Sequence, residues 1–281
     1  MHKVSSRISV LISVCHSDDS GFFNRALKSV WNHQYSKPDE LVIVLDGPLK
    51  PDLNELMRDW TASLGNKIKV VALEKNSGLA AALNRGLEHC RGKWVARMDA
   101  DDISFPERFQ TQLSFLEMHP EVDILGSAAI EINNKGTIGS IRERPLSHET
   151  IMDCLWASPI IHSSVIFRRD KIINLGGYDA SLRRRQDYEL WFRAAEAGLI
   201  FANIQKPLLW YRFDDRTHHK QPPDIALQQA LIGFRGCRRL KLAWWKAFGC
   251  FIPFFRSLLP YRVQHVFYRL LTPLDPRREK C

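Results

Sequence analysis

Apolar and polar positions follow two periods along the first half of the chain. Short runs rich in Val, Ile and Leu are each followed by a segment in which apolar residues recur every three or four positions. The first pattern is typical of buried strands and the second of amphipathic helices. It predicts strands at 8–15, 40–45, 68–73, 94–98 and 122–132, and helices at 22–33, 51–64, 78–90 and 106–118. This alternation indicates an α/β fold with a mostly parallel central sheet flanked by helices.

The second half of the chain is less regular. We predict a helix near 148–156, a strand at 163–168, a Gly176-Gly177 turn, a helix at 187–197 and a strand at 208–212. A break at Pro222-Pro223 precedes a segment with helical character. We therefore expect a main domain over 1–221 and a helical C-terminal extension over 222–281.

The positive charge of the chain is concentrated in that extension. Residues 224–281 contain eight Arg and three Lys against three acidic residues, a net charge of +8 out of +9 for the whole chain. The main domain is therefore nearly neutral, and no nucleic-acid partner is expected. Aromatic residues lie between the basic ones: Trp244, Trp245, Phe248, Phe251, Phe254 and Phe255.

Two roles of the extension remain open. It lacks the roughly 20 apolar residues that a membrane-spanning helix requires. It can lie on an anionic membrane surface, with its aromatic rings in the interface, or pack on the main domain. The six cysteines form no C-x-x-C pair, and no secretory cleavage site follows the first apolar run. We expect neither a zinc site nor a disulfide framework, and a cytoplasmic location.

The strand predicted at 94–98 ends in the acidic cluster Asp99-Ala100-Asp101-Asp102. In open α/β sheets ligands bind beyond the carboxyl ends of the strands. Asp99 and Asp101, two residues apart on a turn, can direct carboxylates toward one point, and Mg²⁺ and Mn²⁺ prefer oxygen ligands. The alternative is a solvated turn that caps the helix starting near Pro106.

Two further segments are candidates for nucleotide binding. Asp46, after the second strand, can accept a hydrogen bond from the imide N–H of uracil, or it can stabilise the Asp-Gly-Pro turn through its own backbone. Lys75-Asn76-Ser77-Gly78 precedes a predicted helix. Its backbone N–H groups can bind a phosphate or a nucleoside, or the segment can be an ordinary helix entry.

Asp187 stands at the start of a predicted helix, after Arg183-Arg184-Arg185-Gln186. An aspartate there is often an N-cap. It can also be a general base that takes the proton from an attacking hydroxyl group, on the face opposite the leaving group. The three arginines can then keep that carboxylate ionised or bind phosphate.

Taken together, these motifs resemble the family 2 glycosyltransferases of the GT-A fold, especially bacterial enzymes of surface polysaccharide and lipopolysaccharide synthesis. The resemblance extends from Ile8 to Arg212. Besides the segments above, it includes Pro106 and Arg108, His162-Ser163-Ser164-Val165, Gly176-Gly177-Tyr178-Asp179 and Gln186-Asp187-Tyr188-Glu189. The order and spacing of these motifs carry it, since each one alone is common.

The resemblance implies a GT-A (Rossmann-like) catalytic domain, with a nucleotide-sugar half at about 1–133 and an acceptor half at about 134–221. It implies inverting sugar transfer from a nucleotide-diphosphate sugar, in first place a UDP-sugar, to a hydroxyl group of a glycan or lipid-linked acceptor, with Mn²⁺ or Mg²⁺. Peripheral association with the cytoplasmic face of the inner membrane would suit a lipid-linked acceptor.

The same resemblance assigns roles to individual residues. Asp46 would contact uracil, Asp99 the ribose and Asp101 the metal, with Asp99 beside it as a second candidate ligand. Asn76 and Gly78 would contact the donor, and Asp187 would be the base. Gln186 replaces a Glu that many relatives have, which alters the local charge. His218 and His219 fall where relatives have a mobile loop; they bind metal or phosphate, or are exposed loop histidines.

Two alternatives belong to other classes. A nucleotidyltransferase would carry a glycine-rich phosphate loop after the first strand, where this chain has Cys15-His16-Ser17-Asp18-Asp19. A non-enzymatic protein that binds a membrane surface or nucleic acid would use the basic aromatic extension. Mutation of Asp101 separates these readings, because it should abolish sugar transfer and leave binding by the extension unchanged.

Overall fold

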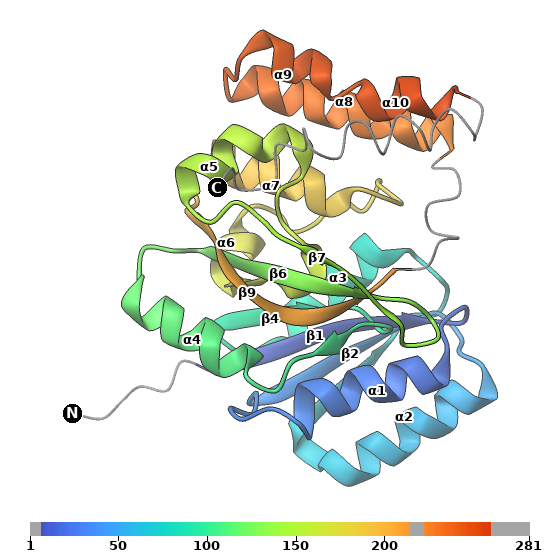
Figure 1. Ribbon diagram of the computed structural model, residues 1–281. Helices are drawn as coiled ribbons and strands as arrows, with labels where there is room; N and C mark the ends of the chain where they lie inside the picture. Colours follow the sequence, from blue (N-terminus) through green and yellow to red (C-terminus); the bar gives the residue numbers. More distant parts are fainter. Residues whose placement is uncertain (1–6, 214–221, 260–281) are drawn as a thin grey trace.

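Helices cover both faces of a central nine-stranded sheet (Figure 1). We describe it from a computed structural model that defines residues 7–213 and 222–259. The strands are β1 (Ile8–Cys15), β2 (Glu40–Asp46), β3 (Ile68–Ala72), β4 (Trp94–Met98), β5 (Ile103–Ser104), β6 (Ile124–Ile132), β7 (Ile138–Arg142), β8 (Ile166–Arg168) and β9 (Phe201–Arg212). The helices are α1 (Ser20–Trp31), α2 (Pro51–Leu64), α3 (Leu79–His89), α4 (Arg108–Met118), α5 (His148–Cys154), α6 (Arg169–Asn174), α7 (Gln186–Glu196), α8 (Pro223–Arg239), α9 (Trp244–Gly249) and α10 (Ile252–Ser257).

The strand order β3-β2-β1-β4-β8-β6-β9-β5, with β7 beside β6, confirms the predicted α/β class. The long ladders, such as β1 with β2 and β6 with β9, are parallel. The antiparallel ladders are short; β8 pairs in this way with both β4 and β6. The sheet is therefore mostly parallel, with β8 joining its two parallel parts.

The central strand β1 shows why this sequence forms a parallel sheet. Val10 and Ile12 pack in the core that includes α1, α2 and α4, whereas Leu11 packs on the other face, in the core that includes α3 and α7. Because both faces are covered, the strand is a nearly continuous apolar run. Its register with β2 and β4 brings Asp46 and the residues after Met98 to one edge of the sheet.

The structure differs from the sequence-based prediction mainly in the second half. β5, β7 and α6 were not predicted; β5 has two residues, and the burial pattern of β7 is almost entirely exposed. The predicted strand at 163–168 is a 3-10 turn (His162–Ser164) followed by β8, and the strand at 208–212 is the end of the longer β9. β5, β8 and β9 pair with strands that are distant in the sequence, and local periodicity does not record such pairing. β7 forms a hairpin with β6, and α6 has only six residues.

The C-terminal extension is helical over its described residues and packs on α7 (Figure 1). Two glycines of α8 permit the close approach. A Cβ atom at Gly236 would lie 2.2 Å from the Phe192 ring, and one at Gly233 would lie 2.5 Å from the Tyr188 hydroxyl. Of the two roles left open for the extension, packing on the main domain is therefore observed for α8. His218, His219 and residues 260–281 lie outside the described residues.

Candidate active site

Three carboxylates converge where β4 ends. Asp99, Asp101 and Asp102 each offer an oxygen atom within 4.8 Å of the others. Asp102 is buried, and its Oδ1 accepts a hydrogen bond of 2.6 Å from the backbone N–H of Arg212, at the end of β9. The helix α4 that follows is preceded by Glu107 and has no side-chain cap. The alternative that the acidic turn caps this helix is therefore wrong.

Burial and neighbouring carboxylates raise the pKa of two residues of this cluster. Burial, followed by repulsion from Asp99, raises the pKa of Asp101 to about 6. The same two causes, with Asp101 as a third, raise the pKa of Asp102 well above its usual value. Carboxylates held this close favour a bound proton or a cation. All three donors are hard oxygen atoms, so the set fits a divalent ion such as Mg²⁺ or Mn²⁺.

A buried arginine lies behind this cluster. Arg97, on β4, is only 2% exposed and forms an ion pair with Asp99. Burial lowers its pKa, but the charge and hydrogen bond of Asp99 together with the charges of Tyr178 and Asp102 raise it more, so the net shift is upward. A charged residue in the middle of a buried strand is the signal from which its importance could have been predicted.

Asp46 holds the loop before α3. Its Oδ1 accepts a hydrogen bond of 2.6 Å from the backbone N–H of Ser77, and its Oδ2 accepts one of 3.0 Å from that of Gly78. The Asn76 amide donates to the backbone carbonyl of Asp46 at 3.4 Å. The structure thus brings together the three predicted donor-binding residues, and the carboxylate stabilises this loop rather than its own turn.

Asp187 lies in the first turn of α7, and the residue preceding the helix is Arg185, with φ of 65°. Asp187 is therefore not the N-cap. Burial raises its pKa, and the charges of Arg185 and Arg97 oppose that rise. Because Arg97 acts on both Asp99 and Asp187, its charge links the acidic cluster to α7.

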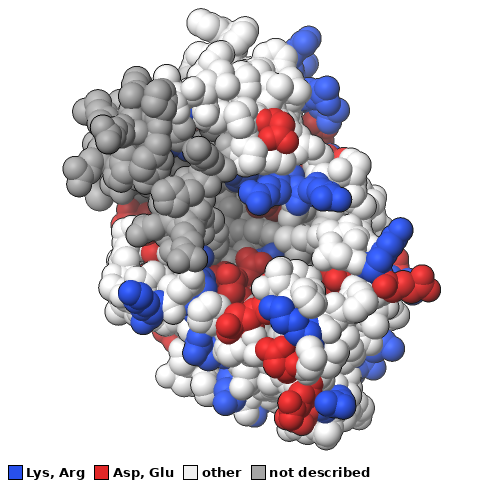
Figure 2. Space-filling view, turned by 90° about the vertical axis from the view of Figure 1, so that its right-hand side faces the viewer, with Lys and Arg blue, Asp and Glu red and all other residues white. Residues whose placement is uncertain are grey.

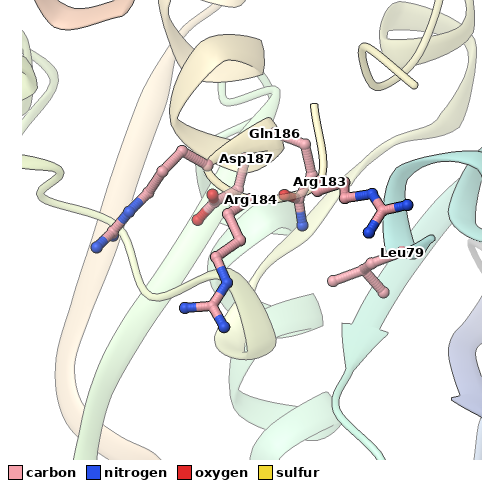
Figure 3. Close-up of a pocket in the computed structure, with 6 residues that line it drawn as sticks. Leu79, Arg183, Arg184, Gln186 and Asp187 are labelled. Atoms are coloured by element: carbon pink, nitrogen blue, oxygen red, sulfur yellow. The ribbon is translucent and has the colours of Figure 1, made fainter. Parts of the chain in front are cut away.

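The start of α7 lines a pocket of about 270 Å³ (Figure 3). Its walls are formed by Leu79, Arg183, Arg184, Arg185, Gln186 and Asp187. Leu79 is the first residue of α3, directly after the loop that Asp46 holds. Figure 2 shows a face of the molecule with a hollow that has basic side chains on one side and acidic side chains on the opposite side. The pocket therefore connects the predicted base with the predicted donor loop.

Tyr178 and His162 complete the buried surroundings of Arg97. The His162 Nε2 atom and the Tyr178 hydroxyl are 2.9 Å apart. Burial, followed by the charge of Arg97, lowers the pKa of His162 well below its usual value, so the ring is neutral. Arg97, Asp187 and Asp99 all act on the Tyr178 hydroxyl, whose pKa is raised chiefly by burial. The motifs contained these two residues without a role, and the charges of both Asp99 and Asp187 act on Tyr178.

Comparison with known proteins defines the class to which this site belongs. Residues 9–190 match the family described as Glycosyl transferase family 2, a span that includes the predicted donor-binding residues, the acidic cluster and Asp187. The chain belongs to this family and is a glycosyltransferase. This assignment rules out the nucleotidyltransferase and the non-enzymatic alternatives.

Individual relatives agree with this assignment. The chain is 40% identical to the amylovoran biosynthesis glycosyltransferase AmsE of Erwinia amylovora, over 73% of this chain and 75% of that one. It is 35% identical to an Escherichia coli UDP-Gal:alpha-D-GlcNAc-diphosphoundecaprenol beta-1,3-galactosyltransferase, over 75% of this chain and 76% of that one. The structure of S. aureus TarS 1-349 in complex with UDP-GlcNAc is similar with a TM-score of 0.66 and 18% identity, covering 97% of this chain and 82% of that one. This last likeness concerns the fold alone.

Proposed function

We propose that this chain transfers a sugar, with inversion, from a nucleotide-diphosphate sugar to a hydroxyl group of a saccharide acceptor in surface polysaccharide synthesis. The observation that carries the proposal is the convergence, at one edge of the sheet, of the acidic cluster and the loop held by Asp46. A UDP-sugar is the proposed donor, since the similar E. coli enzyme is named for UDP-Gal. Its name also supports a lipid-linked saccharide as the acceptor.

In this proposal each side chain has a separate task. Asp101 and Asp99 hold a divalent cation, which supplies positive charge to the donor diphosphate. Asp99 also contacts the ribose. Asp46 accepts a hydrogen bond from the uracil imide, using lone pairs that the loop amides leave available. Asn76 and Gly78 approach the nucleotide from the same loop, whose conformation Asp46 fixes.

Asp187 is the proposed general base. It takes the proton from the acceptor hydroxyl while the hydroxyl oxygen bonds to the anomeric carbon and the nucleotide diphosphate leaves from the opposite face. Its raised pKa suits this task, because a more basic carboxylate removes a hydroxyl proton more readily. Arg185 and Arg97 keep enough of it ionised to act.

The donor can be tested without knowing the acceptor. Hydrolysis of UDP-, GDP- and dTDP-sugars by the full chain should occur with Mn²⁺ and fall when the metal is chelated. Preference for a UDP-sugar and loss of hydrolysis in Asp101→Asn are the expected results. Failure of every donor in the presence of metal would overturn the proposed function.

We also propose that the main domain ends at residue 221 and that the C-terminal extension, from residue 222, has a separate role. In this proposal the extension contacts an anionic membrane surface. Among the described residues, no helix is long and apolar enough to span a membrane. Large side chains nevertheless remain exposed on α9 and α10: Trp244 is 75%, Phe248 62% and Phe255 62% exposed. Residues 225–259 contain six basic residues and no acidic one. Aromatic rings with cations around them are the composition of interfacial helices.

Flotation with vesicles containing phosphatidylglycerol tests this contact. The full chain should float, and a variant with Trp244, Phe248 and Phe255 replaced by serine should float much less. Tyr35→Ser is the matched control, since Tyr35 is 72% exposed but lies in the loop between α1 and β2. Equal flotation by wild type and the triple variant would refute the membrane contact.

A further inference from the structure

The pocket beside Asp187 contains arginines that do not act on the pKa of this base. Burial raises the pKa of Asp187, and the two arginine charges that oppose this rise are those of Arg185 and Arg97. Arg183 and Arg184 line the same pocket and are exposed. Within residues 7–213 and 222–259, neither side chain has an ion pair or hydrogen bond. Among these described residues, the two guanidinium groups next to the base thus have no partner.

The amide of Gln186 is also unsatisfied. Gln186 is 5% exposed, lines this pocket, and its Oε1 atom has no hydrogen-bond partner among the described residues. In the view of Figure 3 its amide lies between the Asp187 carboxylate and the Arg183 side chain. A buried carbonyl oxygen without a donor costs free energy, about 1–3 kcal/mol, unless a ligand satisfies it. A sugar hydroxyl is a donor of the required kind.

We propose that this pocket is an acceptor subsite for a saccharide that carries a phosphate or diphosphate ester, with Arg183 and Arg184 binding the phosphate and Gln186 a sugar hydroxyl. The inference rests on the proposed function and deepens it. Arginine is suited to this role because its planar fork binds phosphate oxygens through two parallel hydrogen bonds.

The side of the reaction on which these arginines lie decides between donor and acceptor. In an inverting displacement the base and the leaving diphosphate are on opposite faces of the transferred sugar. Arg183 and Arg184 line the same pocket as the proposed base, and in this proposal that pocket is on the side from which the acceptor approaches. The proposed partner of the donor diphosphate is a different group, the divalent cation that the acidic cluster would hold.

Acceptors of different charge test the inference. Galactose, N-acetylglucosamine and N-acetylgalactosamine are each offered to the full chain as neutral phenyl glycosides, as 1-phosphates and as alkyl diphosphates. We expect the diphosphate form of the accepted sugar to be used with a kcat/KM at least about tenfold above that of the neutral form, as for charge-assisted hydrogen bonds. Preference for the 1-phosphate over the diphosphate would instead identify a phosphate within a glycan as the ligand.

In Arg183→Gln/Arg184→Gln this preference should fall to nearly one, with the KM of the donor unchanged. Arg58→Gln is the matched control, because Arg58 is exposed on α2. A rise in the donor KM, or an equal loss with neutral and charged acceptors, would overturn the subsite. Absence of donor hydrolysis in the wild type would instead refute the proposed function, so the two failures are distinguishable.

Discussion

The site has two groups of charged side chains, which are held in different ways. We call Asp46 and the acidic cluster the acidic wall, and Arg183 with Arg184 the arginine wall. On the acidic wall, Asp102 accepts a hydrogen bond from a β9 amide, Asp99 is paired with Arg97, and Asp46 accepts from two amides of the donor loop. On the arginine wall, Arg183 and Arg184 are exposed on the loop before α7. Three carboxylates of the acidic wall are thus held by protein partners before any ligand binds, whereas Asp101 and the two arginines are exposed.

This difference fits the two halves of the reaction. A fixed acidic wall reduces the entropy lost when a donor is bound, because its carboxylates are already in place. The arginines lie on a loop and have no partner among the described residues. Substitutions there can alter which ligand is bound without disturbing the sheet. We infer that the donor side of the site is arranged before the donor binds, whereas the acceptor side determines which acceptor is used. The following variants test that comparison.

Asp187→Asn should have the largest effect on transfer that does not act through the metal. An amide cannot take the proton of the acceptor hydroxyl, so kcat should fall by about 10³-fold, within the range usual for loss of a general base. The KM of the donor, measured in the same steady-state assay, should stay near the wild-type value. The control is Asp59→Asn, an exposed position on α2. A kcat within threefold of wild type would remove Asp187 from its role.

Asp101→Asn should mainly affect metal binding. Its loss should weaken Mn²⁺ binding, measured calorimetrically without donor, by more than the roughly 10–100-fold that removal of an outer partner of a metal ligand costs. In the wild type, Mn²⁺ affinity should rise between pH 5 and pH 7.5. The reason is that the pKa of Asp101 is raised to about 6, so protons compete with the metal below that pH. Affinity that does not change with pH would contradict this account.

Asp46→Asn should have a smaller effect, confined to the donor. One of the two backbone N–H groups of Ser77 and Gly78 would then face an amide NH₂ group instead of an oxygen. Loss of one hydrogen bond to a charged group, about 1.5–3 kcal/mol, should raise the donor KM by about tenfold or more. The kcat at saturating donor should change little. An unchanged donor KM would show that this loop does not control donor binding.

Arg185→Asn should have the smallest effect, a shift of the pH profile. Asparagine tolerates the positive φ at this position, so the turn should be preserved. Asp187 is active when ionised, and Arg185 is the largest of the charges that lower its pKa. Without that charge the pKa rises further, and the acid limb of the kcat profile should move to higher pH. A limb that stays in place or moves to lower pH would contradict this assignment.

The order of elements and the family could be predicted from the sequence, because both are recorded locally. The apolar run of β1 and the helical period of α2 lie within a few adjacent residues. The motif Asp99-Ala100-Asp101-Asp102 identified its own cluster for the same reason. Two-residue β5 and the 3-10 turn before β8 were missed, since neither is long enough to show a period.

Tertiary structure alone decided which hydrogen-bonding and charged groups are partners. Asp46 meets the amides of Ser77 and Gly78 only because β2 and the loop before α3 end at the same edge of the sheet. Arg97 acts on both Asp99 and Asp187 because burial excludes water from around it and leaves its charge poorly screened. Sequence determined the residue types and their local periods. Strand order and burial determined their partners, because both depend on contacts between distant segments.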